Sequence, residues 1–388
     1  MLQRVLMFSL IFSIFAPLSS QAQMPLKDSR FDSLLSDYDQ HVASVIEESG
    51  APGVAIAIVK DGQLVFVHGY GVRKMGSPEK VNMHTVFRLA SVSKGFAAVL
   101  TGLLVNDGII SWDDRIIDYL PEFRLADTTN TKQLTIKNIL SHTSGVVPHA
   151  YDNLIEAQVP YYKIMQELHN APVGCEPGTY YGYQNAVYSL IGEVIREATG
   201  KSYRILLKER IFKPLNMIDA SSTRDDLVAN ENYARPHVRR YGQWTPVHLR
   251  DTYYNVCPAA GVNASAWDMG QWMIAMLGDM PQIIPHYVLD EVTTPVVRTR
   301  TERRRFNYKY HIKRAYYGLG WRVFNYDGET MVFHSGGLRG YQAKVAMLPE
   351  HNVGIAVLQH SGFHNRLAYE FIDMYLDLHE ELYANHAD

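Results

Sequence analysis

The sequence contains little cysteine and only one long apolar run, which lies at its N-terminus. Cys175 and Cys257 are the only cysteines among 388 residues. They lie far apart and without clustered histidines, so they make no zinc signature. One disulfide and two free thiols remain open as alternatives. Beyond the N-terminal run, no stretch is apolar and long enough to span a bilayer, and no internal repeat is present.

An excess of charge of either sign is also missing. The chain has 37 Lys and Arg against 40 Asp and Glu, for a net charge of −3. This balance argues against a nucleic-acid-binding protein. The exception is local, because arginines and lysines alternate with tyrosines from Arg298 to Arg314. Such a run is usually a solvated surface segment, and contact with an anionic substrate or an envelope polymer is the alternative.

Residues 1–22 have the features of a secretory signal peptide. Arg4 supplies the positive start, residues 5–18 form a short apolar run, and Ser20-Gln21-Ala22 is a small-x-small cleavage site. The run is too short for a spanning helix. We therefore expect an exported protein, periplasmic or secreted, with no membrane span after cleavage. An uncleaved N-terminal anchor is the alternative.

The remaining residues, 23–388, are expected to form one domain of the α+β class. Strand patterns occur near both ends of the chain and helical patterns between them. This order predicts an antiparallel sheet built from residues 31–84 and 315–388, flanked by N- and C-terminal helices. An all-α region is expected as an insertion over residues 85–314.

Ser91-Val92-Ser93-Lys94 opens an apolar helical run and is the first candidate for chemistry. Residues three apart share a helix face, so Lys94 is expected to lie over the Ser91 hydroxyl. A serine needs an adjacent base to become a nucleophile, and a lysine of lowered pKa can be that base. Ser77 and Lys80 have the same spacing, but they lie in a polar turn that would not bury the lysine.

A serine–lysine pair needs a second proton-transfer group, which a tyrosine can provide if cations lower its pKa. Tyr183-Gln184-Asn185 follows a Pro-Gly turn and precedes a well-formed helix. We therefore expect Tyr183 to relay a proton and Asn185 to orient the substrate. The same Tyr-x-Asn pattern begins at Tyr151 and Tyr253, which we interpret as ordinary loop aromatics, and at Tyr383, which lies in the C-terminal tail, where order is least expected.

His334-Ser335-Gly336-Gly337 ends a predicted strand, and two more strands follow it. Its glycines would let a substrate backbone pair along the strand edge. The backbone N–H groups of Ser91 and Gly337 are the expected oxyanion hole. His360-Ser361-Gly362 repeats the pattern, but it lies between the last strand and the final helix, where a glycine is ordinary loop chemistry.

These motifs, in this order and spacing, resemble the serine β-lactamase and D,D-peptidase superfamily, specifically its class C-like branch. The resemblance covers nearly the whole chain after residue 22 and includes Ile139–Gly145 and Ala259–Met269 as further similar stretches. It implies a sheet flanked by helices, an all-α region and a site between them. It also implies acyl transfer through Ser91, with Lys94 as base, Tyr183 as proton relay and no metal or cofactor.

One residue departs from the branch. Class C β-lactamases have a lysine where this chain has His334, and a histidine carries less fixed charge near pH 7. His334 is expected to tune Tyr183 and the bound carboxylate. We therefore expect an exported hydrolase of a small-molecule or cell-wall peptide substrate, of the D,D-carboxypeptidase, D-peptide or esterase type. A β-lactamase and a penicillin-binding sensor without turnover are the alternatives.

Overall fold

The computed structural model describes residues 29–363 and 366–384. Its main feature is an eight-stranded antiparallel sheet with the strand order β2-β1-β12-β11-β10-β9-β8-β7. The strands are β1 (Gly53–Lys60), β2 (Gln63–Gly71), β7 (Val297–Arg298), β8 (Ile312–Tyr317), β9 (Arg322–Tyr326), β10 (Glu329–Leu338), β11 (Tyr341–Leu348) and β12 (Val353–Gln359). The first and last thirds of the chain therefore meet in the sheet through the pairing of β1 with β12.

Both faces of the central strands are buried. In β1 the side chains of Ala55, Ala57 and Val59 belong to the core beneath the sheet. Val54, Ile56 and Ile58 alternate with them and belong to the core above it. Alternate side chains of a strand point to opposite faces, so a continuous apolar run is what a strand covered on both sides requires.

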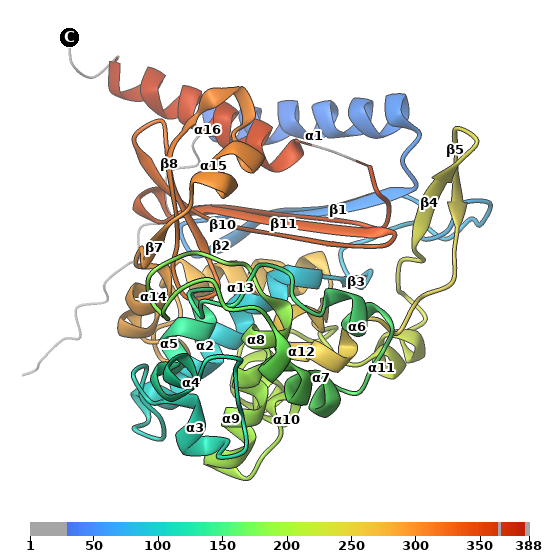
Figure 1. The fold of residues 1–388 in the computed structure, drawn as a ribbon. Coiled ribbons are helices and arrows are strands. Elements are labelled where there is room, and N and C mark those ends of the chain that lie inside the picture. The colour runs from blue at the N-terminus through green and yellow to red at the C-terminus, as the bar shows by residue number, and fades with distance from the viewer. Residues whose placement is uncertain (1–28, 364–365, 385–388) are drawn as a thin grey trace, which may run out of the picture.

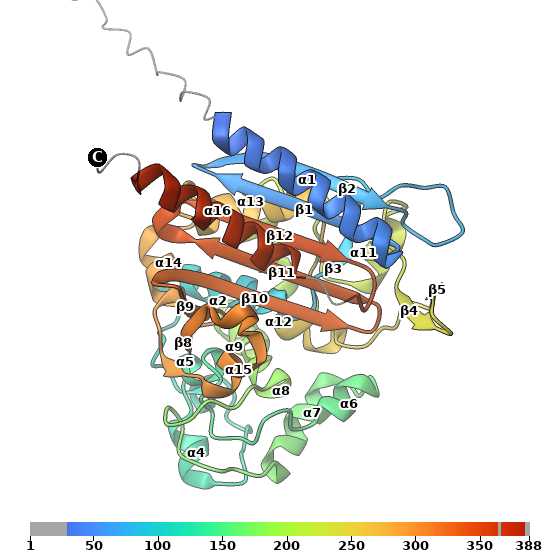
Figure 2. The same cartoon turned by 90° about the horizontal axis from the view of Figure 1, so that it is seen from above.

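Two long helices cover the upper face of the sheet. α1 (Ser29–Ser49) and α16 (Leu367–Ala384) lie side by side across the strands, although they come from opposite ends of the chain (Figures 1 and 2). α1 buries Leu34, Tyr38, Val42 and Ile46, which recur at helical spacing. The Tyr38 hydroxyl donates a hydrogen bond to the Leu367 carbonyl at 2.9 Å and so ties the two helices together.

The opposite face carries the helical region, which lies below the sheet in Figure 1. Its centre is α2 (Ser93–Asn106), in which every residue from Ser93 to Leu104 is buried. The other longer helices of this region are α7 (Tyr161–Glu167), α9 (Leu190–Thr199), α13 (Ala266–Met276) and α14 (His286–Thr293), whereas α15 (Arg300–Phe306) lies on the upper face. Shorter helices are α3 (Ile116–Tyr119), α4 (Thr128–Gln133), α5 (Ile136–Leu140), α6 (Asp152–Glu156), α8 (Asn185–Tyr188), α10 (Tyr203–Leu207), α11 (Arg224–Ala229) and α12 (Cys257–Ala260).

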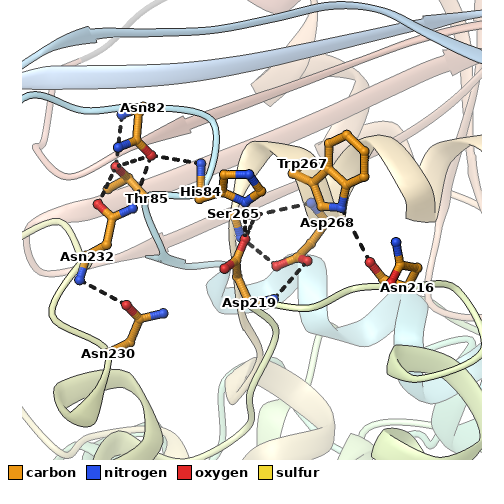
Figure 3. A network of polar contacts seen from close by, with 10 residues as sticks. All are labelled: Asn82, His84, Thr85, Asn216, Asp219, Asn230, Asn232, Ser265, Trp267 and Asp268. Atoms are coloured by element: carbon orange, nitrogen blue, oxygen red, sulfur yellow. Dashed lines mark hydrogen bonds and ion pairs between the residues drawn. The ribbon is translucent and has the colours of Figure 1, made fainter.

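Two small two-stranded sheets complete the fold. β3 (Phe87–Arg88) pairs with β6 (Asn263–Ala264), and β4 (His237–Arg240) pairs with β5 (Gln243–Pro246). The segment before β3 is fastened by the polar network of Figure 3. There the Asp219 carboxylate accepts hydrogen bonds from His84 Nδ1 at 2.9 Å and Ser265 Oγ at 2.8 Å. This network holds the strand that leads directly into Ser91.

The α+β class with flanking helices and an inserted helical region is confirmed. The sheet nevertheless extends further back than the expected residue 315, because β7 and the first half of β8 precede it. β7 has only two residues, and the exposed Lys313 and Arg314 in β8 hide the apolar alternation that marks a strand. α15 is likewise on the upper face of the sheet (Figure 1) and not with the helices below it.

The signal peptide expected over residues 1–22 lies outside the described residues. Within residues 29–363 and 366–384, no helix combines the length and apolar character that a membrane crossing requires. Both cysteines are free thiols, with Cys257 buried and Cys175 half-buried. Of the two alternatives left by the sequence, the structure therefore has the free thiols.

Candidate active site

Ser91 lies in the 3₁₀ turn η1 (Ala90–Val92), directly before α2. The turn is sharp, since Ala90 has a φ of 48° in the left-handed region that a non-glycine residue rarely adopts. β10 presses against the turn, because a Cβ on Gly336 would lie 2.1 Å from the Leu89 carbonyl oxygen and 2.8 Å from the Ser91 nitrogen. Glycine at 336 is therefore required for this approach, which brings the strand beside the Ser91 backbone.

Lys94 is completely buried one turn after Ser91. Its Nζ donates to Asn185 Oδ1 at 2.8 Å and to the Ala259 carbonyl at 3.0 Å, and it lies 3.4 Å from Ser91 Oγ. Burial lowers the pKa of Lys94 well below its usual value, and the Arg322 charge lowers it further, while Asp152 opposes both. A neutral amine has two N–H groups and one lone pair. The two shorter contacts can use the N–H groups, which leaves the lone pair directed at Ser91.

Asn185 begins α8 and joins this pair to a carboxylate. Its Nδ2 donates to both Asp152 oxygens, at 3.0 and 3.2 Å, while its Oδ1 accepts from Lys94. Asp152 also contacts His149 Nδ1 at 2.8 Å. The amide of Asn185 is therefore fixed in orientation between the lysine and the aspartate, and its side chain still lines the cavity described below.

Tyr183 reaches Ser91 from the other side. The two hydroxyl groups share a hydrogen bond, and Lys94 Nζ lies 4.6 Å from the centre of the tyrosine ring. Burial raises the pKa of Tyr183 to about 12, although Arg322 and the hydrogen bond with Ser91 act in the opposite direction. The sequence interpretation required cations that lower this pKa. The structure contains the cation, but the effect of burial is larger, so the phenol is protonated at neutral pH.

The strand β10 forms the wall opposite α2. Ser335, Gly336 and Gly337 all line the cavity, and a Cβ on Gly337 would meet no atom within 4 Å. β10 pairs with β9 only as far as Phe333 opposite Arg322, whereas it pairs with β11 through Leu338. Residues 334–338 therefore have one edge without a neighbouring strand. This edge is the type of backbone surface on which an extended peptide can add as a further strand.

His334 does not line the cavity in this structure. It is fully buried, and its Nε2 accepts a hydrogen bond from Arg322 Nη1 at 3.1 Å, with the Tyr317 hydroxyl also at 3.1 Å. Its Nδ1 lies 3.0 Å from the Ser335 carbonyl and donates to it. Burial, followed by the Arg322 and Lys94 charges, lowers the pKa of His334 well below its usual value. This histidine is neutral and supports Arg322.

Arg322 is a buried cation that donates to His334, the residue that the sequence expected to tune Tyr183 and the bound carboxylate. Its guanidinium group is buried, lines the cavity and lies 5.6 Å from the centre of the Tyr183 ring. It forms an ion pair with Glu302 of α15, whose side chain is 7% exposed. Burial opposes the charge, but Glu302 and the surrounding tyrosines raise the pKa of Arg322, so the cation is permanent.

A cavity of about 470 Å³ opens in front of Ser91. Its walls come from η1, α6, α15, β10, β11 and the loop that carries Tyr183. Its charged side chains are distributed unevenly, with Asp152 from the helical region on one wall. The cations come from α15, the sheet and the start of α16: Arg305, Arg322, Lys344 and Arg366. A bound substrate would therefore meet more positive than negative side chains in this cavity.

The alternative motifs lie elsewhere, with one exception. Ser77 Oγ hydrogen-bonds Glu79, and Lys80 is exposed. His360 is buried against His237 and does not line the cavity. Tyr151 does not line it either, whereas Tyr253 does and donates to Glu156 Oε1 at 3.4 Å. The side chain of Tyr383 lies outside the described residues.

Sequence reasoning missed Arg322, Glu302 and Asp152. Glu302 is the single acid in the run Arg300–Phe306, and an acid alone among arginines is a signal for a buried ion pair. Asp152 follows Tyr151 in a Tyr-x-Asn pattern that was judged only by its tyrosine. Arg322 lies in a strand of mainly buried residues, where a cation needs a partner. Among the described residues, no group of three or more His, Cys, Asp or Glu side chains is arranged to hold a metal ion.

The antiparallel sheet, the helical region and the buried Ser-x-x-Lys pair at their junction define the fold of the serine β-lactamases and penicillin-binding proteins. Among solved structures, the octameric penicillin-binding protein homologue from Pyrococcus abyssi matches with a TM-score of 0.78 and 22% identity. The match covers 88% of this chain and 77% of that one. The family described as Beta-lactamase matches residues 38–370. The chain belongs to this family.

Three proteins with similar sequences have names that indicate different activities or leave the activity unstated. Unguisins hydrolase ungD of Aspergillus violaceofuscus (strain CBS 115571) is 26% identical, over 87% of this chain and 64% of its own length. Protein flp of Staphylococcus aureus (strain MRSA252) is 24% identical, over 84% and 63%. Penicillin-binding protein 4 of Amycolatopsis lactamdurans is 26% identical, over 91% and 88%. The chain thus spans less than two thirds of the first two proteins and most of the third.

Proposed function

We infer that this protein is an exported serine hydrolase that forms an acyl-enzyme on Ser91. The observation that carries the inference is the position of Lys94 Nζ, 3.4 Å from Ser91 Oγ with its other two short contacts on acceptor oxygens. The lowered pKa of Lys94, caused first by burial, supports an amine that is able to accept a proton. Export rests on the signal sequence expected over residues 1–22.

In the proposed reaction, Ser91 Oγ attacks a carbonyl carbon while its proton passes to Lys94. The oxyanion would lie against the backbone N–H groups of Ser91 and Gly337. Tyr183 gives its phenolic proton to the leaving group and takes one from the Lys94 ammonium group. Water then attacks the acyl-enzyme and releases Ser91. A phenol with a pKa of about 12 is suited to this donor role.

We propose a D-peptide with a free C-terminal carboxylate as the preferred substrate, as in a D,D-carboxypeptidase. The permanent charge of Arg322 supports this choice over a neutral ester, because Arg322 lines the cavity beside Tyr183, the proposed proton donor to the leaving group. The unpaired edge of β10 supports an extended peptide backbone. The names of two relatives, a hydrolase and a penicillin-binding protein, are consistent with acyl-transfer chemistry.

β-Lactam hydrolysis is the second candidate, and Arg322 is the observation that favours it. A neutral His334 was the reason to expect little affinity for the carboxylate of a β-lactam. Arg322 offers that carboxylate a fixed cation in place of a lysine.

Steady-state turnover of three substrates distinguishes these activities: a D-Ala-D-Ala peptide, nitrocefin and a short neutral ester. The proposal expects release of D-alanine with the highest kcat/KM of the three. Nitrocefin as the best substrate would identify a β-lactamase. Acylation of Ser91 without release of product from any of them would identify a sensor.

A further inference from the structure

The basic segment expected from the sequence forms a cleft, separate from the cavity at Ser91. A hollow of about 250 Å³ lies between α15, β7 and the start of β8. It is lined by Ala315 and by six polar side chains: Arg298, Thr299, Arg300, Arg303, Arg304 and Arg314. Within the described residues, none of the five guanidinium groups forms an ion pair with a carboxylate. Like charges gathered in this way repel one another until an anion joins them.

A second, independent observation lies at the floor of the cleft. Thr299 is 2% exposed, and its hydroxyl has no hydrogen-bond partner. It precedes α15 without capping the helix through its side chain. Its backbone N–H donates to the Ala315 carbonyl at 2.8 Å, and its carbonyl accepts from the Arg303 N–H at 3.2 Å. A buried hydroxyl without a partner is costly, so a ligand that accepts its hydrogen bond would remove that cost.

One face of α15 lines the cleft, and the opposite face lines the cavity at Ser91. Arg300, Arg303 and Arg304 recur at the spacing of one helix face and line the cleft. Glu302, Arg305 and Phe306 recur at the same spacing on the opposite side. Glu302 pairs with Arg322, and the other two line the cavity at Ser91. A ligand in the cleft would therefore hold the helix that supports Arg322.

We propose that this cleft is a binding site for a phosphate group, carried by a small phosphate ester or by a phosphodiester polymer. Guanidinium groups match phosphate oxygens with paired, charge-assisted hydrogen bonds, and several of them from different elements can surround one phosphate. The side chain of Arg303 is held at the cleft by a hydrogen bond from its Nη1 to the Lys313 carbonyl of β8 at 3.2 Å. The Thr299 hydroxyl is the neutral donor at the base of the site.

Calorimetric titration of the full chain in phosphate-free buffer tests the site without any use of catalysis. The probes are pyrophosphate, a glycerol phosphate oligomer and, as an anion without phosphate, poly-L-glutamate of similar charge. Arg303→Gln and Arg314→Gln should each weaken binding about tenfold or more, as expected for loss of a charge-assisted hydrogen bond. Stronger binding of pyrophosphate indicates a small ester, and stronger binding of the oligomer indicates a polymer. Equal binding of poly-L-glutamate would overturn the proposal.

Arg240→Gln is the matched control. Arg240 is equally exposed and lines a second basic hollow, of about 860 Å³, beside the β4–β5 hairpin. Its removal lowers the net charge by the same amount and should leave binding unchanged. If Arg240→Gln weakens binding as much as Arg303→Gln, the anions respond only to overall charge and the site does not exist.

Thr299→Val distinguishes a specific binding site from non-specific electrostatic association of anions with the arginines. Without ligand the variant should melt at the same temperature as the wild type or higher, because an unpartnered buried hydroxyl is removed. Its affinity for the phosphate probe should nevertheless fall several-fold. Unchanged affinity in this variant would contradict a ligand at the floor of the cleft.

Discussion

Removal of Arg322 is the perturbation that most sharply separates a carboxylate-binding site from a general hydrolase site. Arg322 is the buried cation of the cavity and lies 5.6 Å from the ring centre of Tyr183. A hydrogen bond between charged groups contributes about 1.5–3 kcal/mol, which corresponds to about a 10- to 150-fold change in kcat/KM. This loss should apply only to substrates that present a carboxylate.

The single variant Arg322→Gln would change both substrate binding and protein stability, so its effect on binding alone could not be measured. Arg322→Gln leaves Glu302 buried without its partner, and breaking a buried pair in this way costs about 3–5 kcal/mol of stability. Arg322→Gln/Glu302→Gln removes both charges and leaves two amides of similar size. The double variant should therefore be closer to the wild type in melting temperature than either single variant.

The assay compares one peptide that ends in a free D-alanine carboxylate with the same peptide as its C-terminal amide. In the wild type, the acid should be cleaved with the higher kcat/KM. In the double variant this preference should fall about 10- to 150-fold, while cleavage of the amide changes much less. Arg304→Gln, on the opposite face of α15, is the control and should keep the wild-type ratio. An unchanged ratio in the double variant would refute carboxylate recognition by Arg322.

Three further predictions concern the proton-transfer groups and stability. Tyr183→Phe should lower kcat about 10²–10⁴-fold with the fold intact. Tyr253 lines the cavity without contacting Ser91, so Tyr253→Phe should alter mainly KM. Equal losses of kcat in the two variants would contradict Tyr183 as the proton donor. Burial lowers the pKa of Lys94, so kcat/KM should rise with pH, and the midpoint of this rise should lie below the usual lysine pKa of about 10.4. Lys94→Met should abolish the rise. A midpoint at the usual lysine value would contradict a buried base. Burial raises the pKa of Asp268 to about 7. This shift stabilises the fold fully below about pH 4, by at most about 4 kcal/mol, and the contribution is lost as the pH rises through 7. The free energy of unfolding, measured by chemical denaturation from about pH 4 to 8, should depend less on pH in Asp268→Asn than in the wild type, and an equal slope would contradict the shift.

The regular elements were the predictable part of the structure. The sequence predicted a helix at the N-terminal flank of the sheet, and the structure has α1 there over Ser29–Ser49. Gly200 ends α9 with a φ of 70°, a conformation that glycine adopts readily after a helix. These features depend on spacing and on the conformational freedom of one residue, both of which are local properties.

The site was predictable where it rests on local spacing. Ser91 and Lys94 meet because they are one helical turn apart, and Tyr183 and Asn185 share a short turn before α8. The charged partners depend on tertiary contacts. Arg322 and Glu302 are 20 residues apart and meet only because α15 packs against β8, which pairs with β9 at Arg322. A pattern along the chain contains no signal for that packing.

His334 shows why a motif position does not settle a role. Its place after Phe333 in a strand directs its side chain to the face opposite that of Phe333. It contacts Arg322, Tyr317 and the Trp321 ring, and burial there keeps the His334 ring neutral. The sequence identified the residue, but the neighbour that carries the charge came from the next strand.

Mapping the residue that becomes acylated tests the proposed chemistry most directly. The protein is incubated with a fluorescent penicillin or a fluorophosphonate, digested, and the adduct is located by mass spectrometry. We predict a single adduct on Ser91, lost in Ser91→Ala and strongly slowed in Lys94→Met, because the nucleophile and its base act as a unit. An adduct on Ser77, or labelling that persists in Ser91→Ala, would contradict Ser91 as the nucleophile.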